Sequence, residues 1–89
     1  MWMNLYKKGN LAKSIAGHDK EQIFVIVEEK GEYVYVADGR LRTIEKPKRK
    51  NKKHIQPIYY SNEQVPEIRH NEDIKRVIKL FGAESAGVR

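Results

Sequence analysis

The chain has 89 residues, no cysteine and a formal net charge of +6. A domain of this length buries only about 60–65% of the surface of its unfolded chain, so it has little room for an enclosed catalytic cleft and we do not expect an enzyme. The absence of cysteine excludes disulfides, thiolate metal sites and thiol nucleophiles, and it fits a reducing compartment. No apolar run reaches the length of a signal peptide or a membrane span, so we expect a cytoplasmic protein without membrane association.

The positive charge is concentrated in one segment. Residues 40–54 contain eight cations and one acid, Glu45, which gives a formal +7, whereas the rest of the chain has 10 basic and 11 acidic residues. A concentrated positive field attracts and orients a polyanion, and nucleic acids are the most available intracellular polyanions. The charge distribution therefore favours a nucleic-acid partner.

The first half of the chain reads as short strands. Residues 9–15 predict one strand, and residues 23–27, which are all apolar and mostly β-branched, predict a central strand buried on both faces. Residues 28–31 are a polar break ending in glycine, and residues 33–37 resume a strand of high β-propensity.

Asp38 and Gly39 predict a type I′ turn, after which residues 40–44 run back along residues 33–37 as the second strand of a hairpin. A two-residue turn fixes the register of the two strands, and the period of two then sorts their side chains. The core-facing set is Val34, Val36, Leu41 and Thr43, and the outer set is Tyr33, Tyr35, Arg40 and Arg42. A further strand over residues 54–60 is weakened by Pro57.

The last third predicts a helix over residues 71–81. Asn71 is a favourable N-cap, and Gly82 is well placed to end the helix. Ile74, Val77 and Ile78 fall on one face together with Phe81, and this stripe packs against the sheet or, alternatively, against a partner. We expect a loop or one irregular turn over residues 61–70, fraying of residues 83–89, and a single domain over residues 1–89.

The cations of residues 46–53 are interrupted by Pro47 and Asn51, which predicts an extended, mobile, solvated loop. Lysine predominates there, which favours contact with the phosphate backbone over reading of bases. A solubilising loop and a membrane-surface loop are the alternatives. The outer hairpin face offers tyrosines that could stack bases, although cross-strand packing alone would also explain them. The candidate RNA-binding residues are Lys46, Lys48, Arg49, Lys50, Lys52, Lys53, Arg40, Arg42, Tyr33, Tyr35, His18 and Lys20.

No arrangement of residues suggests catalysis or a metal site. The three histidines, His18, His54 and His70, lie in separate predicted elements without cysteine or a short ligand pair. Asp38 is explained by its turn, and Glu72 and Asp73 are explained by the helix N-terminus. We therefore expect no catalytic residues, cofactor, metal or small-molecule substrate.

Residues 9–27, GNLAKSIAGHDKEQIFVIV, resemble a KOW motif. The shared features are a glycine opening a strand, alternating hydrophobic residues, a small-Gly-x-Asp-Lys loop at Ala16 to Lys20, and a hydrophobic strand. Glu21 stands where a glycine commonly follows the lysine. Residues 37–42 and the KPKRK tract look like the subset related to large-subunit ribosomal proteins of archaea and eukaryotes and their short bacterial relatives. The resemblance covers residues 9–58.

This resemblance implies a mainly β fold, a small SH3-like β-barrel of the KOW type, here with a short C-terminal α-helix. It also implies RNA binding, usually to ribosomal RNA, in a ribosome-associated protein of translation or in the transcription machinery. The sequence thus predicts a non-enzymatic protein that binds ribosomal or other structured RNA. The alternative is a protein–protein adaptor, in which the barrel or the helix docks on a partner of the translation or transcription machinery and the basic loop binds an acidic surface.

Overall fold

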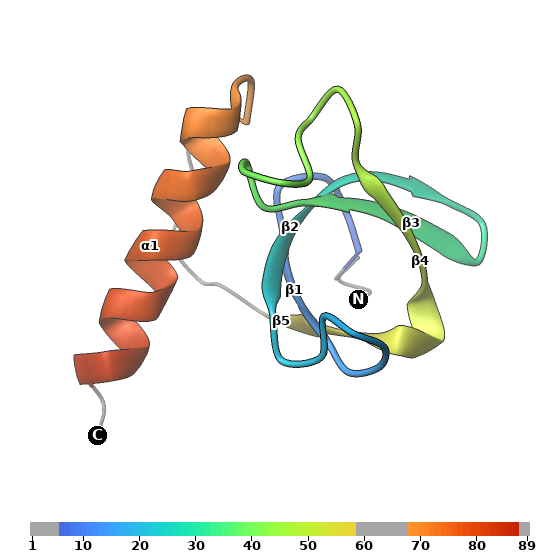
Figure 1. Ribbon diagram of the computed structural model, residues 1–89, viewed down its shortest axis with the longest axis horizontal. Helices are drawn as coiled ribbons and strands as arrows, with labels where there is room; N and C mark the ends of the chain where they lie inside the picture. The colour runs from blue at the N-terminus through green and yellow to red at the C-terminus, as the bar shows by residue number, and fades with distance from the viewer. Residues whose placement is uncertain (1–5, 59–67, 88–89) are drawn as a thin grey trace, which may run out of the picture.

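Five antiparallel strands form one strongly curled sheet, and a C-terminal helix lies along one side of it (Figure 1). This computed structural model describes residues 6–58 and 68–87, and the side chains of residues 82–87 are outside the description. The elements are β1 (Leu11–Ser14), β2 (Ile23–Lys30), β3 (Tyr33–Ala37), β4 (Lys48–Asn51), the 3-10 helix η1 (Lys52–His54), β5 (Ile55–Ile58) and α1 (Asn71–Gly87). The predicted mainly β fold with a C-terminal helix is confirmed.

The strand order is β4-β3-β2-β1-β5, so β4 and β5 are the two edges of the sheet. The three-residue η1 joins these edges directly, which the curl of the sheet makes possible (Figure 1). Within the described residues, no backbone pairing between β4 and β5 closes the sheet into a barrel. The strand predicted over residues 54–60 corresponds to β5, and its last two residues lie outside the described part of the chain.

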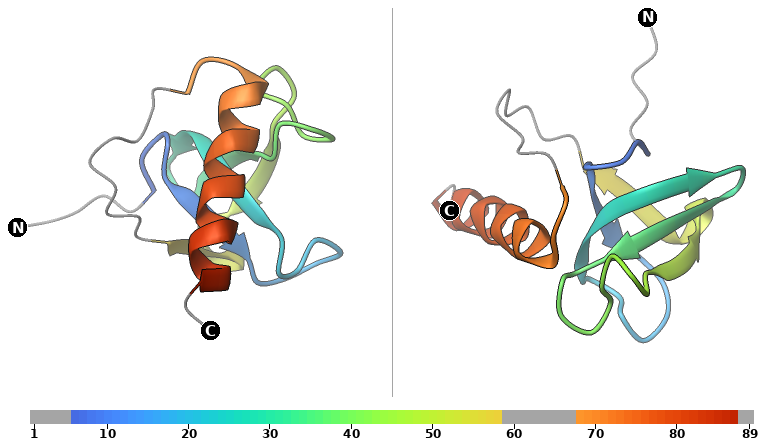
Figure 2. Two further views of the ribbon diagram at one scale, coloured as in Figure 1. Left: turned by 90° about the vertical axis from the view of Figure 1, so that its left-hand side faces the viewer. Right: turned by 90° about the horizontal axis from the view of Figure 1, so that it is seen from above.

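Strand β2 is buried on both sides, as its run of apolar residues predicts. Phe24 and Ile26 lie in an inner cluster with residues of β1, β3 and β5. Val25 points the other way, into a second cluster with Ile74 and Val77 of α1. Figure 2 shows α1 lying across this side of the sheet. Each fully buried aliphatic or aromatic side chain contributes about 1.5–3 kcal/mol, so the apolar stripe of α1 fixes the helix on the sheet.

The polar break predicted over residues 28–31 is shorter in the structure. Strand β2 continues to Lys30, with an irregularity in its pairing between Ile26 and Glu28, and the turn consists of Gly31 and Glu32. A β-bulge lets a strand continue past one unpaired residue. Beyond the bulge, Glu28 and Lys30 pair with Tyr35 and Tyr33, which places two charged side chains beside two tyrosines.

The predicted hairpin between residues 33–37 and 40–44 is wrong. Strand β3 pairs with β4 instead, and Tyr35 lies opposite Arg49. A type I′ turn needs positive φ at both central residues, but only Gly39 has it, at +81°. The carboxylate of Asp38 accepts hydrogen bonds from the backbone N–H groups of Arg40 and Arg42, at 2.8 and 3.0 Å. This local side-chain turn replaces the hairpin, and Leu41, predicted to face the core, is 89% exposed.

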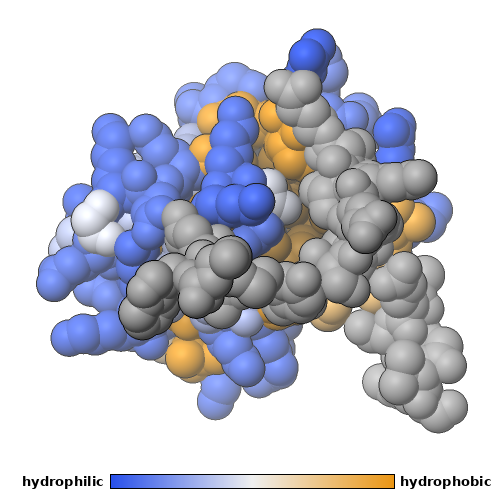
Figure 3. Space-filling model, turned by 180° about the vertical axis from the view of Figure 1, so that it is seen from behind, coloured by the Kyte–Doolittle hydropathy of each residue, from blue (hydrophilic) through white to orange (hydrophobic). Residues whose placement is uncertain are grey.

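The mobile basic loop predicted over residues 46–53 is also wrong. Residues 48–51 form β4 and residues 52–54 form η1, whose N-cap Asn51 accepts a hydrogen bond from the backbone N–H of Lys53. Because a strand alternates its side chains, Lys48 and Lys50 point inward with Val36 and Val34, and Arg49 points outward with Tyr35. Hydrophilic residues cover much of the face seen in Figure 3, as expected for a highly charged chain.

Helix α1 begins at the predicted residue and continues past the predicted end. It runs through Gly82 to Gly87, because glycine in a helix interior costs only about 1 kcal/mol. Asn71 is not the cap: its side chain accepts a hydrogen bond from the backbone N–H of Ile44. The carboxylate of Asp73 accepts the backbone N–H groups of Arg69 and His70 instead. The first turn of α1 is thereby tied to the segment that leaves the Asp38 turn.

Candidate nucleic-acid interface

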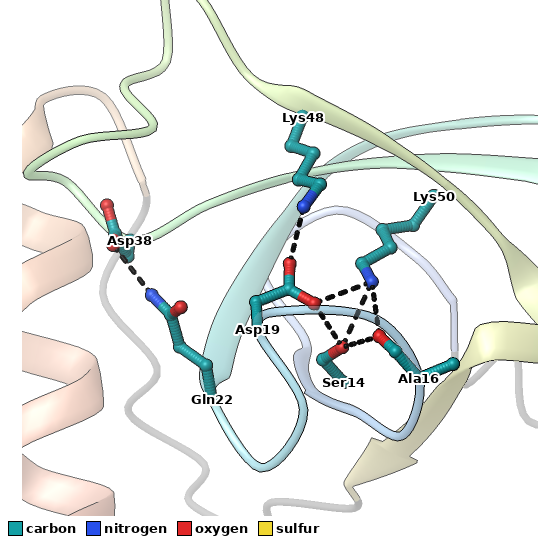
Figure 4. Close-up of polar contacts among 7 residues, drawn as sticks. All are labelled: Ser14, Ala16, Asp19, Gln22, Asp38, Lys48 and Lys50. Carbon is teal, nitrogen blue, oxygen red and sulfur yellow. Dashed lines mark hydrogen bonds and ion pairs between the residues drawn. The ribbon is translucent and has the colours of Figure 1, made fainter.

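Two inward lysines of β4 meet one carboxylate from the β1–β2 connection, and we call this group, which also includes Ser14 and Ala16, the Lys50 cluster (Figure 4). Lys50 Nζ donates to Asp19 Oδ1 at 2.8 Å, to Ser14 Oγ at 3.0 Å and to the carbonyl of Ala16 at 3.0 Å. Lys48 Nζ donates to Asp19 Oδ2 at 2.8 Å. All three N–H donors of Lys50 therefore have acceptors, which explains how a lysine can be 8% exposed.

The charge of Asp19 is strongly stabilised in the folded protein. Burial opposes ionisation, but hydrogen bonds from Lys48, Lys50 and Ser14, together with the charge of Lys50, hold the pKa of Asp19 well below its usual range. The Asp19 side chain is 11% exposed, so solvent screens this interaction only weakly. The cluster therefore pins residues 17–22, which belong to the connection between β1 and β2, against β4.

A second acid neutralises another cation of the basic segment. Lys52 Nζ forms an ion pair with Glu29 of β2 and lies 4.8 Å from the ring centroid of Tyr6. Three of the predicted RNA-binding lysines thus hold the sheet together. Adding Asp19 and Glu29 to eight cations and one acid lowers the formal charge of this part of the molecule from +7 to +5.

The outward side chains at the end of β2 and along β3 and β4 form a surface that we call the outer face, made up of Glu28, Lys30, Tyr33, Tyr35, Arg49 and Asn51. Glu28 and Lys30 form an ion pair at 3.7 Å on this face. The guanidinium of Arg49 lies 4.8 Å from the ring centroid of Tyr33, and Lys30 Nζ lies 5.9 Å from that of Tyr35. Arg49 is exposed and Tyr33 is 38% exposed. The sequence predicted tyrosines beside cations here, but the cations are Arg49 and Lys30 in place of Arg40 and Arg42.

The residues of the Asp38 turn, 38–42, form a well-braced loop. Backbone N–H groups of Asp38 and Gly39 donate to the carbonyl of Arg42, at 2.9 and 3.0 Å. Gln22 Nε2 donates to Asp38 Oδ2 at 2.8 Å, which ties the turn to the start of β2 (Figure 4). Gly39 lies against α1 so closely that an added Cβ would be 2.6 Å from the carbonyl oxygen of Asn71. The turn thus presents Arg40 and Arg42 to solvent from a fixed backbone.

The remaining predicted residues are dispersed. Lys46 and Lys53 are exposed, and within the described residues neither side chain forms an ion pair. His18 and Lys20 are exposed on residues 17–22, the connection that the Lys50 cluster holds, and no hydrogen bond or ion pair joins either side chain to the other candidates in the described part. The structure thus groups Tyr33, Tyr35 and Arg49 on one surface and leaves the other exposed cations on the neighbouring turns.

Sequence reasoning missed the Lys50 cluster and the role of Lys30. The sequence places Asp19 only in the small-Gly-x-Asp-Lys loop, because its partners Lys48 and Lys50 are 29 and 31 residues away in the chain. The alternation of Lys48, Arg49, Lys50 and Asn51 was the available signal, since a strand there would place alternate side chains on opposite sides.

Other kinds of site have little support. Within residues 6–58 and 68–87, no three histidine, aspartate or glutamate side chains are grouped so that they could hold a metal ion. The part of the chain that the structure describes contains no helix long and apolar enough to span a membrane.

A comparison with protein-family models and a search of curated proteins both give no match.

Proposed function

We propose that this protein is a non-enzymatic RNA-binding protein that holds a single-stranded or looped segment of structured RNA on its outer face. The observation that carries the proposal is the exposed pair of Tyr33 and Arg49, stacked at 4.8 Å on adjacent strands. Unpaired bases stack on tyrosine rings and on guanidinium planes, and each base–aromatic stack contributes about 1–3 kcal/mol. Tyr35, with Lys30 above its ring, extends the surface along the same strand.

The phosphate contacts in this proposal come from the exposed cations of residues 40–53. These are Arg40, Arg42, Lys46, Arg49 and Lys53. Lys48, Lys50 and Lys52 are assigned instead to structure, because their charges are paired with Asp19 and Glu29. Five contacts at about −0.7 each on a single strand give a slope of log K against log salt of about −3.5.

We further propose that the sheet is an SH3-like β-barrel of the KOW type. Its curl, with η1 linking the two edge strands, supports a barrel that is open by one pairing. Glu21 supports the KOW resemblance in particular. It has φ of +79°, a left-handed conformation that favours glycine, and it occupies the position where the KOW motif commonly has glycine. Ribosomal RNA is the partner that this resemblance favours.

Two matched variants test the charge contribution. Lys46→Gln/Arg49→Gln removes two exposed charges of the basic segment, and Lys7→Gln/Lys8→Gln removes two exposed charges outside it. Binding to a fluorescent single-stranded RNA, measured from 50 to 500 mM salt, should lose about 1.4 units of slope in the first variant and none in the second. Equal slopes in both variants and the wild type would overturn the assignment.

Tyr33→Ala tests the stacking contribution separately. It should weaken RNA binding by about 5- to 150-fold at every salt concentration without changing the slope, because stacking releases no counterions. Affinity purification before and after nuclease treatment distinguishes the adaptor alternative. RNA binding predicts that co-purifying partners are lost with nuclease, whereas one protein retained in stoichiometric amount would favour an adaptor.

A further inference from the structure

A second group of cations lies along α1, away from the outer face. An open groove of about 840 Å³ is lined by residues of the Asp38 turn, the start of β2 and α1. Its cationic lining is Arg40 from the turn and Lys75, Arg76 and Lys79 from the helix. Helix spacing explains the grouping, since residues 75, 76 and 79 fall on one side of α1 while Ile74 and Val77 pack on the sheet.

The two acids of this groove are already engaged. Asp38 accepts hydrogen bonds from Gln22 and from two backbone N–H groups of its own turn. Glu72 forms an ion pair with Lys75 at 3.2 Å. By contrast, no salt bridge to Arg40, Arg76 or Lys79 occurs within the described part of the chain. The groove therefore offers three cations without a direct ionic partner to an anion from solution.

The walls of the groove are held in place before anything binds. The turn is braced by the Gln22–Asp38 hydrogen bond, and Gly39 is seated against the first turn of α1. Asn71 at the start of the helix accepts the backbone N–H of Ile44 beyond the turn. A site that is ordered in advance loses less entropy when it binds a ligand.

We propose that this groove binds the sugar–phosphate backbone of the same RNA that the outer face contacts, and the inference rests on the proposed function. Residues 40–49 run from the groove, at Arg40, to the outer face, at Arg49, and carry exposed Arg42 and Lys46 between them. An occupant that follows all of these cations needs regularly spaced negative charges over a length comparable with the 33 Å extent of the protein. A nucleic-acid strand has this property, and the C–H faces of its sugars can pack on Ile23 and Ile78 in the groove lining.

The test uses the full chain with Arg76→Gln/Lys79→Gln and two oligouridylates, of 4 and 16 nucleotides. For the longer RNA, the salt slope should fall by about 1.4 units in the variant. The affinity of the variant relative to the wild type should therefore be about 25-fold lower at 0.1 M salt than at 1 M salt. The shorter RNA, which fits on the outer face alone, should bind as it does to the wild type. Lys7→Gln/Lys8→Gln is the control of equal charge, and circular dichroism checks that each variant is folded.

Three results would overturn the inference. If the 16-mer binds the helix variant with an unchanged slope while Lys46→Gln/Arg49→Gln still lowers it, the groove is not an RNA site and the proposed function stands. If polyglutamate binds the wild type without competing with RNA, and this binding is absent in the helix variant, the groove binds acidic peptides instead. If neither oligonucleotide binds the wild type, the proposed function and the groove assignment both fail.

Discussion

Replacing Lys50 by methionine tests whether the Lys50 cluster holds residues 17–22 onto β4. Methionine has a long unbranched side chain like that of lysine, but it lacks the three N–H groups that donate hydrogen bonds to Asp19, Ser14 and Ala16. Breaking a buried ion pair costs about 3–5 kcal/mol. Because Lys48 still neutralises Asp19 at 2.8 Å, we expect a smaller loss, about 2–3 kcal/mol of the free energy of unfolding.

Urea unfolding followed by circular dichroism measures this loss, and the thermal midpoint should fall by about 8–24 °C. Lys46→Met is the matched control, since Lys46 is exposed and should change stability by no more than about 0.5 kcal/mol. In a double-mutant cycle, Lys50→Met and Asp19→Asn should couple by about 1 kcal/mol or more. A loss at Lys50 equal to that at Lys46, or a coupling energy near zero, would refute the structural role of the cluster.

Three further predictions concern the connections between elements. Glu21→Gly should stabilise the protein by about 1 kcal/mol relative to Glu21→Ala, because both lose the exposed ion pair with Lys13 and only glycine relieves φ of +79°; equal urea midpoints would show that Glu21 is unstrained. Ionised Asp19 contributes stability above about pH 4 that is lost as the pH falls, since its folded pKa lies below its unfolded value. Thermal melts between pH 4 and pH 2 should therefore decline more steeply for the wild type than for Asp19→Asn, and parallel declines would contradict the low pKa. Gly39→Ala should cost about 2–3 kcal/mol and Gly31→Ala only about 1 kcal/mol, because both have positive φ but only Gly39 would bring a Cβ against the backbone of α1; similar losses in unfolding experiments would mean that the Asp38 turn is not seated on the helix.

The strands and the helix were predictable where the apolar pattern decides them. The uninterrupted run of residues 23–27 required burial on both sides, and β2 provides it by placing Val25 against α1 and its neighbours inside the sheet. The stripe of Ile74 and Val77 similarly identified the packed side of α1. These features depend on hydrophobic periodicity, which a single sequence displays directly.

The pairing of β3 was not predictable from local signals. Asp38 and Gly39 favour a hairpin when read alone, but the carboxylate of Asp38 caps its own turn. The chain then passes beside the first turn of α1, where Ile44 donates to Asn71, before it pairs with β3 as β4. Strand β4 is almost entirely charged, so nothing in its composition suggests a partner for Val34 and Val36. Its place depends on Asp19, a partner that only the folded chain brings close.

The basic segment consequently has two roles in this account. Alternate residues of β4 divide it: Lys48 and Lys50 are paired inside, and Arg49 is exposed on a tyrosine. Net charge identified the segment as unusual but could not show which charges are available to a partner. Burial and pairing decide that, and they reduce the candidate phosphate contacts to the exposed cations.

An NMR titration with a single-stranded RNA of 8–10 nucleotides tests the central claim most directly. We expect the largest changes in amide shift in β3 and β4, around Tyr33, Tyr35 and Arg49, with further changes in the Asp38 turn. The amides of β1 and of residues 17–22 should change little, because these segments contact the inward side chains of β4 and not the outer face. Changes confined to residues 17–22, or no changes at millimolar RNA in 50 mM salt, would contradict RNA binding by the outer face.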